Sequence, residues 1–120
     1  MNKILVADDA SFMRLMIRQI LARRGYHDIL EAENGQIAVD LFKLHKPDLI
    51  MLDITMPELD GLAALGEILA IEPAAQVIMC SAIAQDSMVR EALARGALDF
   101  VVKPFRPEEL LRVVSKYLQA

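Results

Sequence analysis

The hydrophobic residues of this chain fall into five short runs that are separated by longer amphipathic segments. The runs occupy residues 4–7, 29–32, 49–52, 77–80 and 100–102. Their first residues are 25, 20, 28 and 23 positions apart, so the runs recur at nearly regular intervals. Short runs that are apolar throughout are typical of strands that are buried on both faces of a parallel sheet. The pattern therefore predicts five strands.

Between these runs, apolar residues recur every three or four positions, which places them on one face of a helix. The first helical segment carries such a stripe at Met13, Ile17 and Leu21 and ends at Gly25. The other predicted helices span 36–45, 61–71, 85–95 and the segment from Pro107 toward Leu118. Residues that favour helix ends flank them, namely Asn34, Gly35, Asp60, Gly96 and Pro107. Strand and helix thus alternate five times.

This alternation predicts an α/β fold, a doubly wound parallel sheet with helices on both faces. The run 29–32 contains Glu31 and is the most polar, so we expect it at an exposed edge of the sheet. We expect the other four strands to be interior or better covered. Because the chain has no linker or low-complexity segment and only 120 residues, we expect residues 1–120 to form a single domain.

Composition narrows the class of protein. The chain is 55% hydrophobic and 25% charged, which excludes intrinsic disorder. Its net charge of −4 provides no basic surface for nucleic acid. No apolar run approaches the roughly 20 residues that span a bilayer, and the opening run is too short for a signal peptide, so we expect a cytoplasmic protein. The single cysteine, Cys80, lies in a predicted strand and is expected to be a buried thiol.

Polar residues gather where the predicted strands end. Asp8 and Asp9 follow the first strand, Asp53 the third, Ser81 the fourth and Lys103 the fifth. Ligands of open α/β sheets bind beyond this carboxyl edge. Clustered carboxylates repel one another unless a cation neutralises them, and magnesium, which prefers oxygen ligands and often shares a phosphate, fits best. A lysine and a hydroxyl suit phosphate oxygens. The set predicts a magnesium site that handles a phosphoryl group.

Each of these residues also has an ordinary structural explanation. The Asp8–Asp9 pair could be a solvated turn or a cap for the helix that starts near Ser11. Asp53 precedes a turn at 56–61, where aspartate is common. A single lysine or serine at a strand end indicates little by itself. The hypothesis of a site depends on the coincidence of all five groups at one sheet edge.

With these motifs the sequence resembles a response-regulator receiver domain over the chain from Lys3 to Leu118. The segments that carry the resemblance are 6–9 (VADD), 51–57 (MLDITMP) with 60–61 (DG), 80–82 (CSA), 96–97 (GA) and 101–105 (VVKPF). The resemblance implies a flavodoxin-like fold, with five parallel strands in the order 2-1-3-4-5 and five helices. It also implies a two-component signalling protein and not an enzyme in the usual sense.

The resemblance assigns roles to the strand-end residues. Asp53 would accept a phosphoryl group from a histidine kinase. Asp9 and Asp53 would ligate magnesium directly together with the backbone carbonyl of Thr55, and Asp8 would reach the metal through water. Ser81 and Lys103 are the expected ligands of the phosphoryl oxygens.

Three further expectations follow from the resemblance. Ser81 and Phe100 would form the switch that changes the surface made by the fourth helix, fifth strand and fifth helix. The Lys103–Pro104 peptide bond would be cis. The lifetime of the phosphorylated state would depend in part on Thr55 and Ile83.

The motifs look most like stand-alone chemotaxis receivers. This implies a histidine kinase of the CheA type upstream, the flagellar motor switch downstream and a separate phosphatase, with the protein itself expected to be a monomer. A single-domain receiver of another phosphorelay is the main alternative. A phosphohydrolase with an aspartyl nucleophile is less favoured, because its second acid would stand at Thr55. A dinucleotide-binding enzyme is excluded, because Asp8 and Asp9 stand where that class needs a glycine-rich turn. A receiver that only binds a partner is disfavoured, because all five site groups are present.

Two sets of residues receive other assignments. His27 and His45 are expected on the surface without a role, because neither has a cysteine or histidine partner at metal-ligand spacing. The side chains of Phe12, Met13 and Met16 in the first helix are expected to be core, although part of this helix could contact a kinase.

Overall fold

The computed structural model describes residues 2–118, in which five strands alternate with five helices. The strands are β1 (Ile4–Ala7), β2 (Ile29–Ala32), β3 (Leu49–Asp53), β4 (Val77–Ala82) and β5 (Asp99–Lys103). The helices are α1 (Ser11–Ala22), α2 (Gly35–His45), α3 (Gly61–Ile71), α4 (Asp86–Arg95) and α5 (Pro107–Tyr117). Every predicted strand and helix is present, with bounds that differ by at most three residues. The alternation seen in the sequence is therefore confirmed.

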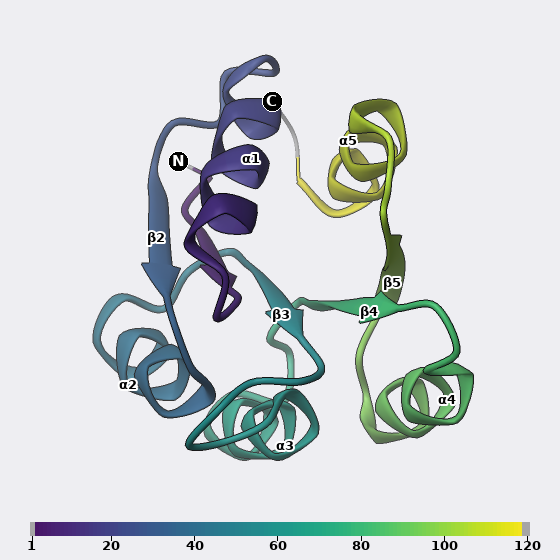
Figure 1. The fold of residues 1–120 in the computed structure, drawn as a ribbon. Helices are drawn as coiled ribbons and strands as arrows, with labels where there is room; N and C mark the ends of the chain where they lie inside the picture. Colours follow the sequence, from purple (N-terminus) through teal and green to yellow (C-terminus); the bar gives the residue numbers. More distant parts are fainter. Residues whose placement is uncertain (1, 119–120) are drawn as a thin grey trace.

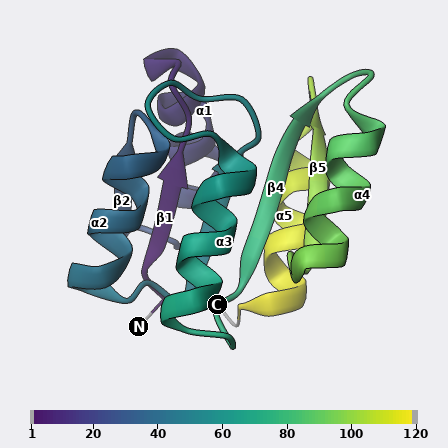
Figure 2. The ribbon, with the colours of Figure 1, turned by 90° about the horizontal axis from the view of Figure 1, so that it is seen from below.

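The five strands form one parallel sheet in the order β2-β1-β3-β4-β5. Figure 1 shows α1 and α5 on one face of this sheet and α2, α3 and α4 on the other. The view from below in Figure 2 shows the strands running side by side between the two helical layers. This is the doubly wound α/β fold that the sequence predicts. Its carboxyl edge collects the ends of all five strands.

Two hydrophobic layers, one on each face of the sheet, make up the core. Successive residues of β1 illustrate the division, because Ile4 and Val6 pack toward α1 and α5 whereas Leu5 and Ala7 pack toward α2 and α3. Neighbours in a strand point to opposite faces, so a strand with helices on both sides must be apolar throughout. This is why the strands read as continuous apolar runs. None of the helices in residues 2–118 is long and apolar enough to cross a membrane.

The exposure of the edge strands corrects one expectation. β2 lies at an edge and is partly exposed, as its composition predicts. β5, however, is not better covered, because the strand order places it at the opposite edge. Phe100 and Val102 are each 39% exposed. An edge strand has only one neighbouring strand, and α4 and α5 leave the side chains of β5 partly open to solvent.

A second correction concerns α1. The expectation that Phe12 and Met16 are core is wrong, because their exposed fractions are 71% and 37%. Met13 is half-buried and packs against the layer under α1 and α5. The buried residues of this helix are Ile17, Ile20 and Leu21. The buried residues of α1 therefore lie in its second half, and Phe12 in its first turn is left open to solvent.

Candidate functional site

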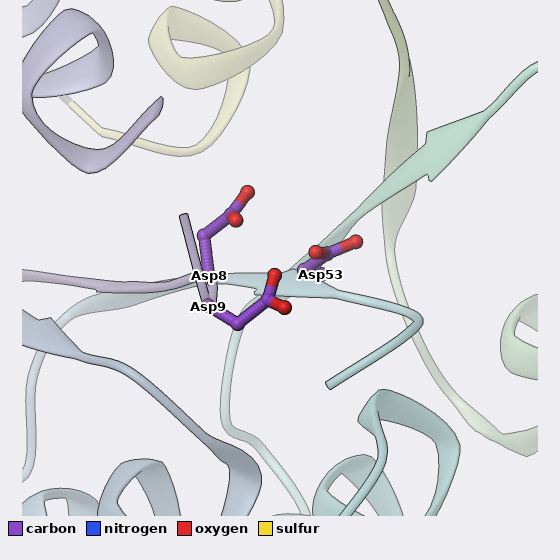
Figure 3. Close-up of side chains that lie close together, drawn as sticks. All are labelled: Asp8, Asp9 and Asp53. Atoms are coloured by element: carbon purple, nitrogen blue, oxygen red, sulfur yellow. The ribbon is translucent and has the colours of Figure 1, made fainter. Parts of the chain in front are cut away.

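Three aspartates converge at the carboxyl edge of the sheet. Asp8 and Asp9 directly follow β1, Asp53 ends the adjacent strand β3, and one carboxylate oxygen from each lies within 4.8 Å of the others. Figure 3 shows their side chains projecting from the ends of these two strands. Asp8 and Asp53 are buried, whereas Asp9 is exposed. The fold therefore brings together the acids that the sequence places at the strand ends.

Lys103 reaches this cluster from the end of β5, across the intervening strand β4. Its Nζ lies 2.7 Å from Asp8 Oδ2 and 3.2 Å from Asp53 Oδ2. The long, flexible stem of lysine makes this approach feasible from two strands away. The Lys103–Pro104 peptide bond is cis. One ammonium therefore serves as counter-ion to two buried carboxylates.

The electrostatics of the cluster are unbalanced. Burial raises the pKa of Asp53, the charge of Asp8 adds to this effect, and Lys103 opposes it without cancelling it. Burial by itself would lower the pKa of Lys103, but the hydrogen bond to Asp8 and the charge of Asp53 outweigh burial and raise it. Lys103 is therefore firmly charged, and the ionised form of Asp53 is disfavoured. An additional cation in this space would relieve the imbalance.

The explanation of Asp8 and Asp9 as a helix cap does not hold. The cap position of α1 is Ala10, and no side chain caps this helix. Asp8 is only 2% exposed, and its Oδ1 accepts a hydrogen bond of 2.9 Å from the Ala10 backbone N–H. That bond fixes the Asp8 carboxylate and turns its second oxygen toward Lys103. Only Asp9 has the exposure of a residue in a solvated turn.

The loop after Asp53 is held tightly against the end of β3. The Gly61 N–H donates to the Ile54 carbonyl over 2.7 Å, and a Cβ at Gly61 would collide with the Asp53 carbonyl oxygen. Asp60 caps α3 by accepting from the Ala63 N–H. The Asp60–Gly61 pair, which the sequence identifies as a turn, thus fixes the backbone that presents Asp53.

Ser81 and Phe100 lie on the neighbouring strands β4 and β5. Ser81 is 1% exposed, and its β5 register partner is Val102. The Phe100 side chain, two residues before Val102, lines a groove of about 210 Å³ between β5 and α4 with Val89, Leu93 and neighbouring residues. Phe100 therefore lies at the surface and not in the core.

Three other sequence assignments can be placed in the structure. Cys80 is buried in β4, and burial raises the pKa of its thiol to about 12, in agreement with a core role. His27 and His45 are both exposed, as expected. Thr55 lies two residues after Asp53, and its side chain is exposed at the mouth of the site.

One residue near the site was missed by the sequence analysis, which treated Gln85 only as the start of a helix. Its side chain accepts from the Ala82 N–H and donates to Thr55 Oγ1. A signal was present, because Gln85 occupies the cap position of α4, where serine, threonine, aspartate or asparagine is preferred. A glutamine at that position suggests a side chain used for something other than capping.

The donor set fits a magnesium ion. Carboxylate oxygens are hard ligands of the kind that magnesium prefers, and Asp8, Asp9 and Asp53 offer them within a small space. Two of these acids are buried beside a single lysine, so a divalent cation would offset charge that the chain itself leaves uncompensated. The open side at Asp9 leaves room for the waters that magnesium usually retains.

Comparisons with known proteins agree with this geometry. A family model described as "Response regulator receiver domain" matches residues 4–115. The chemotaxis protein CheY of Bacillus subtilis (strain 168) is 51% identical over 117 residues, which cover 98% of each chain. "Protein CcdB" of the same organism is 48% identical over 118 residues, again 98% of each chain.

Solved structures give the same result. The crystal structure of the receiver domain of NtrX from Brucella abortus matches with a TM-score of 0.91 at 35% identity, covering 97% of this chain and 98% of that one. The family model and the relatives thus span almost the whole chain, and the aspartates and lysine that carry the sequence resemblance meet at one sheet edge. This chain belongs to the response regulator receiver family.

Proposed function

We propose that this protein is a phosphoacceptor switch: Asp53 receives a phosphoryl group from a histidine kinase in a magnesium-dependent reaction. The phosphorylated form then binds a protein target through the surface of α4, β5 and α5. In chemotaxis the kinase would be of the CheA type and the target the flagellar motor switch, with a separate phosphatase to reset the signal. We further propose a single-domain cytoplasmic monomer.

The observation that carries this proposal is the position of Asp53. Its carboxylate is 7% exposed at a sheet edge, with two other acids within 4.8 Å and the Lys103 ammonium at 3.2 Å. A carboxylate needs no general base to act as a nucleophile, because its ionised form carries no proton to remove. The neighbouring groups supply what phosphoryl transfer requires, namely positioning and charge neutralisation.

In the reaction, an Asp53 carboxylate oxygen attacks phosphorus in line with the bond to the kinase histidine. The bond between phosphorus and the histidine nitrogen breaks, its electron pair stays on the nitrogen, and an acyl phosphate forms on Asp53. Lys103 neutralises charge on the phosphoryl oxygens, and the Ser81 hydroxyl donates a hydrogen bond to one of them. Magnesium, on which receiver domains generally depend, would be held by Asp8, Asp9, Asp53 and the Thr55 carbonyl and would offset the charge that develops on the phosphoryl oxygens. Hydrolysis of the acyl phosphate by water resets the signal, at a rate to which Thr55 and Ile83 contribute.

The proposed switch links Asp53 to the exposed strand β5. Ser81 lies one strand away from Asp53, and movement of its hydroxyl toward the phosphoryl group would vacate space beside β5. Phe100 would turn inward to fill that space, which would change the groove that it lines with α4. Because phenylalanine has no hydroxyl, the switch works through packing and not through a hydrogen bond of the ring.

Intact mass after incubation with acetyl phosphate tests the phosphorylation directly. We expect one added phosphoryl group that requires both magnesium and Asp53, so Asp53→Asn gives none. Asp40→Asn, a change of the same type at an exposed position of α2, is the matched control and should be phosphorylated normally. Release of free phosphate without a mass shift would instead support the phosphohydrolase. If the mass does not shift and no phosphate is released, the phosphoacceptor and the phosphohydrolase are both contradicted.

The similarity to two relatives with different printed names keeps a second candidate open. CheY and "Protein CcdB" of B. subtilis are 51% and 48% identical to this chain, so a phosphorelay outside chemotaxis is the alternative. A pull-down with the phosphorylated protein, using Asp53→Asn as the unphosphorylated reference, distinguishes them. Capture of a flagellar switch protein supports chemotaxis, and capture of a second histidine phosphotransfer protein supports the relay.

A further inference from the structure

The Gln85 side chain bridges two loops that border the site. Its Oε1 accepts from the Ala82 N–H at 2.6 Å, and its Nε2 donates to Thr55 Oγ1 at 3.0 Å. Ala82 ends β4, whereas Thr55 lies in the loop between β3 and α3. The contact with Thr55 joins segments that are 30 residues apart in sequence. Gln85 therefore acts as a clasp, by which we mean these two hydrogen bonds, across the mouth of the site.

Both ends of the clasp adjoin a reacting group. Thr55 lies two residues after Asp53, the last residue of β3, so the hydrogen bond from Gln85 to Thr55 restrains the loop that follows Asp53. Ala82 directly follows Ser81, so a hydrogen bond that fixes the Ala82 N–H also restrains the backbone that carries the Ser81 hydroxyl.

The loop of residues 82–85, which the clasp holds, has an unfavourable backbone conformation. Ala84 has a φ of 74°, in the left-handed region that residues with a Cβ rarely adopt. The side chain of Ile83 next to it is 74% exposed and contributes little packing. With so little burial, the conformation of residues 82–85 depends on the hydrogen bonds that Gln85 makes.

We propose that Gln85 is a positioning residue that stabilises the unphosphorylated conformation of the site, and that its clasp opens when the phosphoryl group binds. This inference rests on the proposed function of Asp53. The Ala82 N–H is occupied by Gln85 in the present conformation, so a movement of Ser81 toward a phosphoryl group that carries the Ala82 backbone with it would break this hydrogen bond. A group that stabilises the resting state reduces the fraction of protein that is competent to bind.

The direction of the effect follows from this linkage. Removing the clasp destabilises only the resting conformation, so a ligand that binds the switched conformation becomes tighter by the same factor. We expect Gln85→Ala to tighten binding of beryllofluoride, a mimic of a carboxylate-bound phosphoryl group, by about three- to tenfold, the size expected for one or two exposed hydrogen bonds. A merely structural role would give weaker binding, because an impaired site binds less well.

The experiment is a beryllofluoride titration in magnesium, followed by NMR, with amide hydrogen exchange of Ala82 measured on the same samples. Wild type, Gln85→Ala, Thr55→Val and the double variant form a cycle, and Gln36→Ala on α2 is the matched control with an exposed glutamine. We expect the Ala82 amide to exchange faster in Gln85→Ala, the two single changes to be non-additive, and Gln36→Ala to match wild type.

The outcomes separate this inference from the proposed function. If wild type binds beryllofluoride and Gln85→Ala binds it with the same or lower affinity, the clasp does not stabilise the resting conformation. The phosphoacceptor role proposed for Asp53 is then unaffected. If wild type does not bind at all, the phosphoacceptor function and the clasp fail together. Unchanged exchange of the Ala82 amide in Gln85→Ala would also overturn the inference, because the hydrogen bond would then protect nothing.

Discussion

The charge balance of the site predicts that Asp53→Asn stabilises the protein in the absence of metal. Asparagine has nearly the same shape as aspartate but carries no charge, so the substitution removes a buried carboxylate whose ionised form the native structure disfavours. Under the proposed function magnesium binds that carboxylate, so the sign of the effect should reverse when the metal is added. Most point substitutions destabilise a protein, which makes the prediction distinctive.

The magnitude follows from three opposing contributions. At an effective dielectric constant of about 20, two carboxylates at the 4.8 Å upper limit of the cluster would repel by about 3.5 kcal/mol, and the Lys103 ammonium at 3.2 Å attracts Asp53 by about 5 kcal/mol. Burial of the charge costs several kcal/mol and is the largest of the effects on the pKa of Asp53. The contributions nearly cancel and leave a small net cost for the ionised carboxylate. We therefore expect Asp53→Asn to raise the free energy of unfolding by about 1 kcal/mol, or the Tm by roughly 3–6 °C.

The pH dependence has a definite sign. The pKa of Asp53 is raised in the folded protein, so native wild type loses stability as the pH rises from the ordinary aspartate value of about 4 through the folded pKa. The asparagine of the variant does not titrate. The advantage of the variant should therefore be absent in acid, grow across this window and be complete at pH 7.

Urea unfolding followed by far-ultraviolet circular dichroism measures the effect, since the chain has no tryptophan. The variant is compared with wild type in chelator and in magnesium, and Asp40→Asn, which is exposed on α2, should stay within about 0.5 kcal/mol of wild type in both. Magnesium at tenfold over its Kd should stabilise wild type alone by about 1.4 kcal/mol. An Asp53→Asn variant that is less stable than wild type in chelator at pH 7 would refute the charge argument.

Three further predictions concern the surroundings of Asp53. Lys103→Met should lower the free energy of unfolding by about 2–4 kcal/mol in chelator, because two buried carboxylates lose their cation. Magnesium should restore part of the lost stability. Equal losses with and without metal in urea titrations would contradict this prediction. The Cys80 thiol, with its pKa raised to about 12, should resist iodoacetamide at mildly alkaline pH until urea unfolds the protein, and labelling of the folded form would be inconsistent with its burial. Gly61→Ala should lower the free energy of unfolding by more than about 2 kcal/mol, because the new Cβ collides with the Asp53 carbonyl. Gly66→Ala on α3, whose Cβ would meet nothing within 4 Å, should be neutral or stabilising. Similar urea midpoints for the two variants would argue against the close approach at Gly61.

The sequence was sufficient to predict the sheet and the residues at its carboxyl edge. Parallel strands under two helical layers must be apolar throughout, so Asp8 and Asp53 stand out as the first charges after such runs. All strands of a parallel sheet end at one edge, which is why residues 45 positions apart in the chain could be expected to meet. The strand order itself came from the family resemblance, because crossover length alone does not determine it.

Other features depend on packing that a pattern along the chain does not contain. The exposure of Phe100 depends on β5 lying at an edge, and the apolar run 100–102 looks the same as a buried one. Phe12 is apolar at a helical position, yet it is mostly exposed to solvent. The contacts of Gln85 require the loops after β3 and β4 to approach each other, which local sequence does not specify.

The same imbalance of charge that costs stability prepares the site for its chemistry. Asp8 and Asp53 share one lysine and Asp9 lies beside them, so the cluster keeps net negative charge, part of it buried, that an added cation would relieve. A phosphoryl group on Asp53 adds further negative charge, so it raises the demand for Lys103, whose Nζ now lies closer to Asp8 than to Asp53. Lys103 is the last residue of β5, so under the proposed function a shift of its side chain toward the phosphoryl oxygens would act on the strand that carries the exposed Phe100 and Val102. Under the proposed function, Asp53→Asn should therefore stabilise the metal-free fold and at the same time remove the coupling between residue 53 and β5.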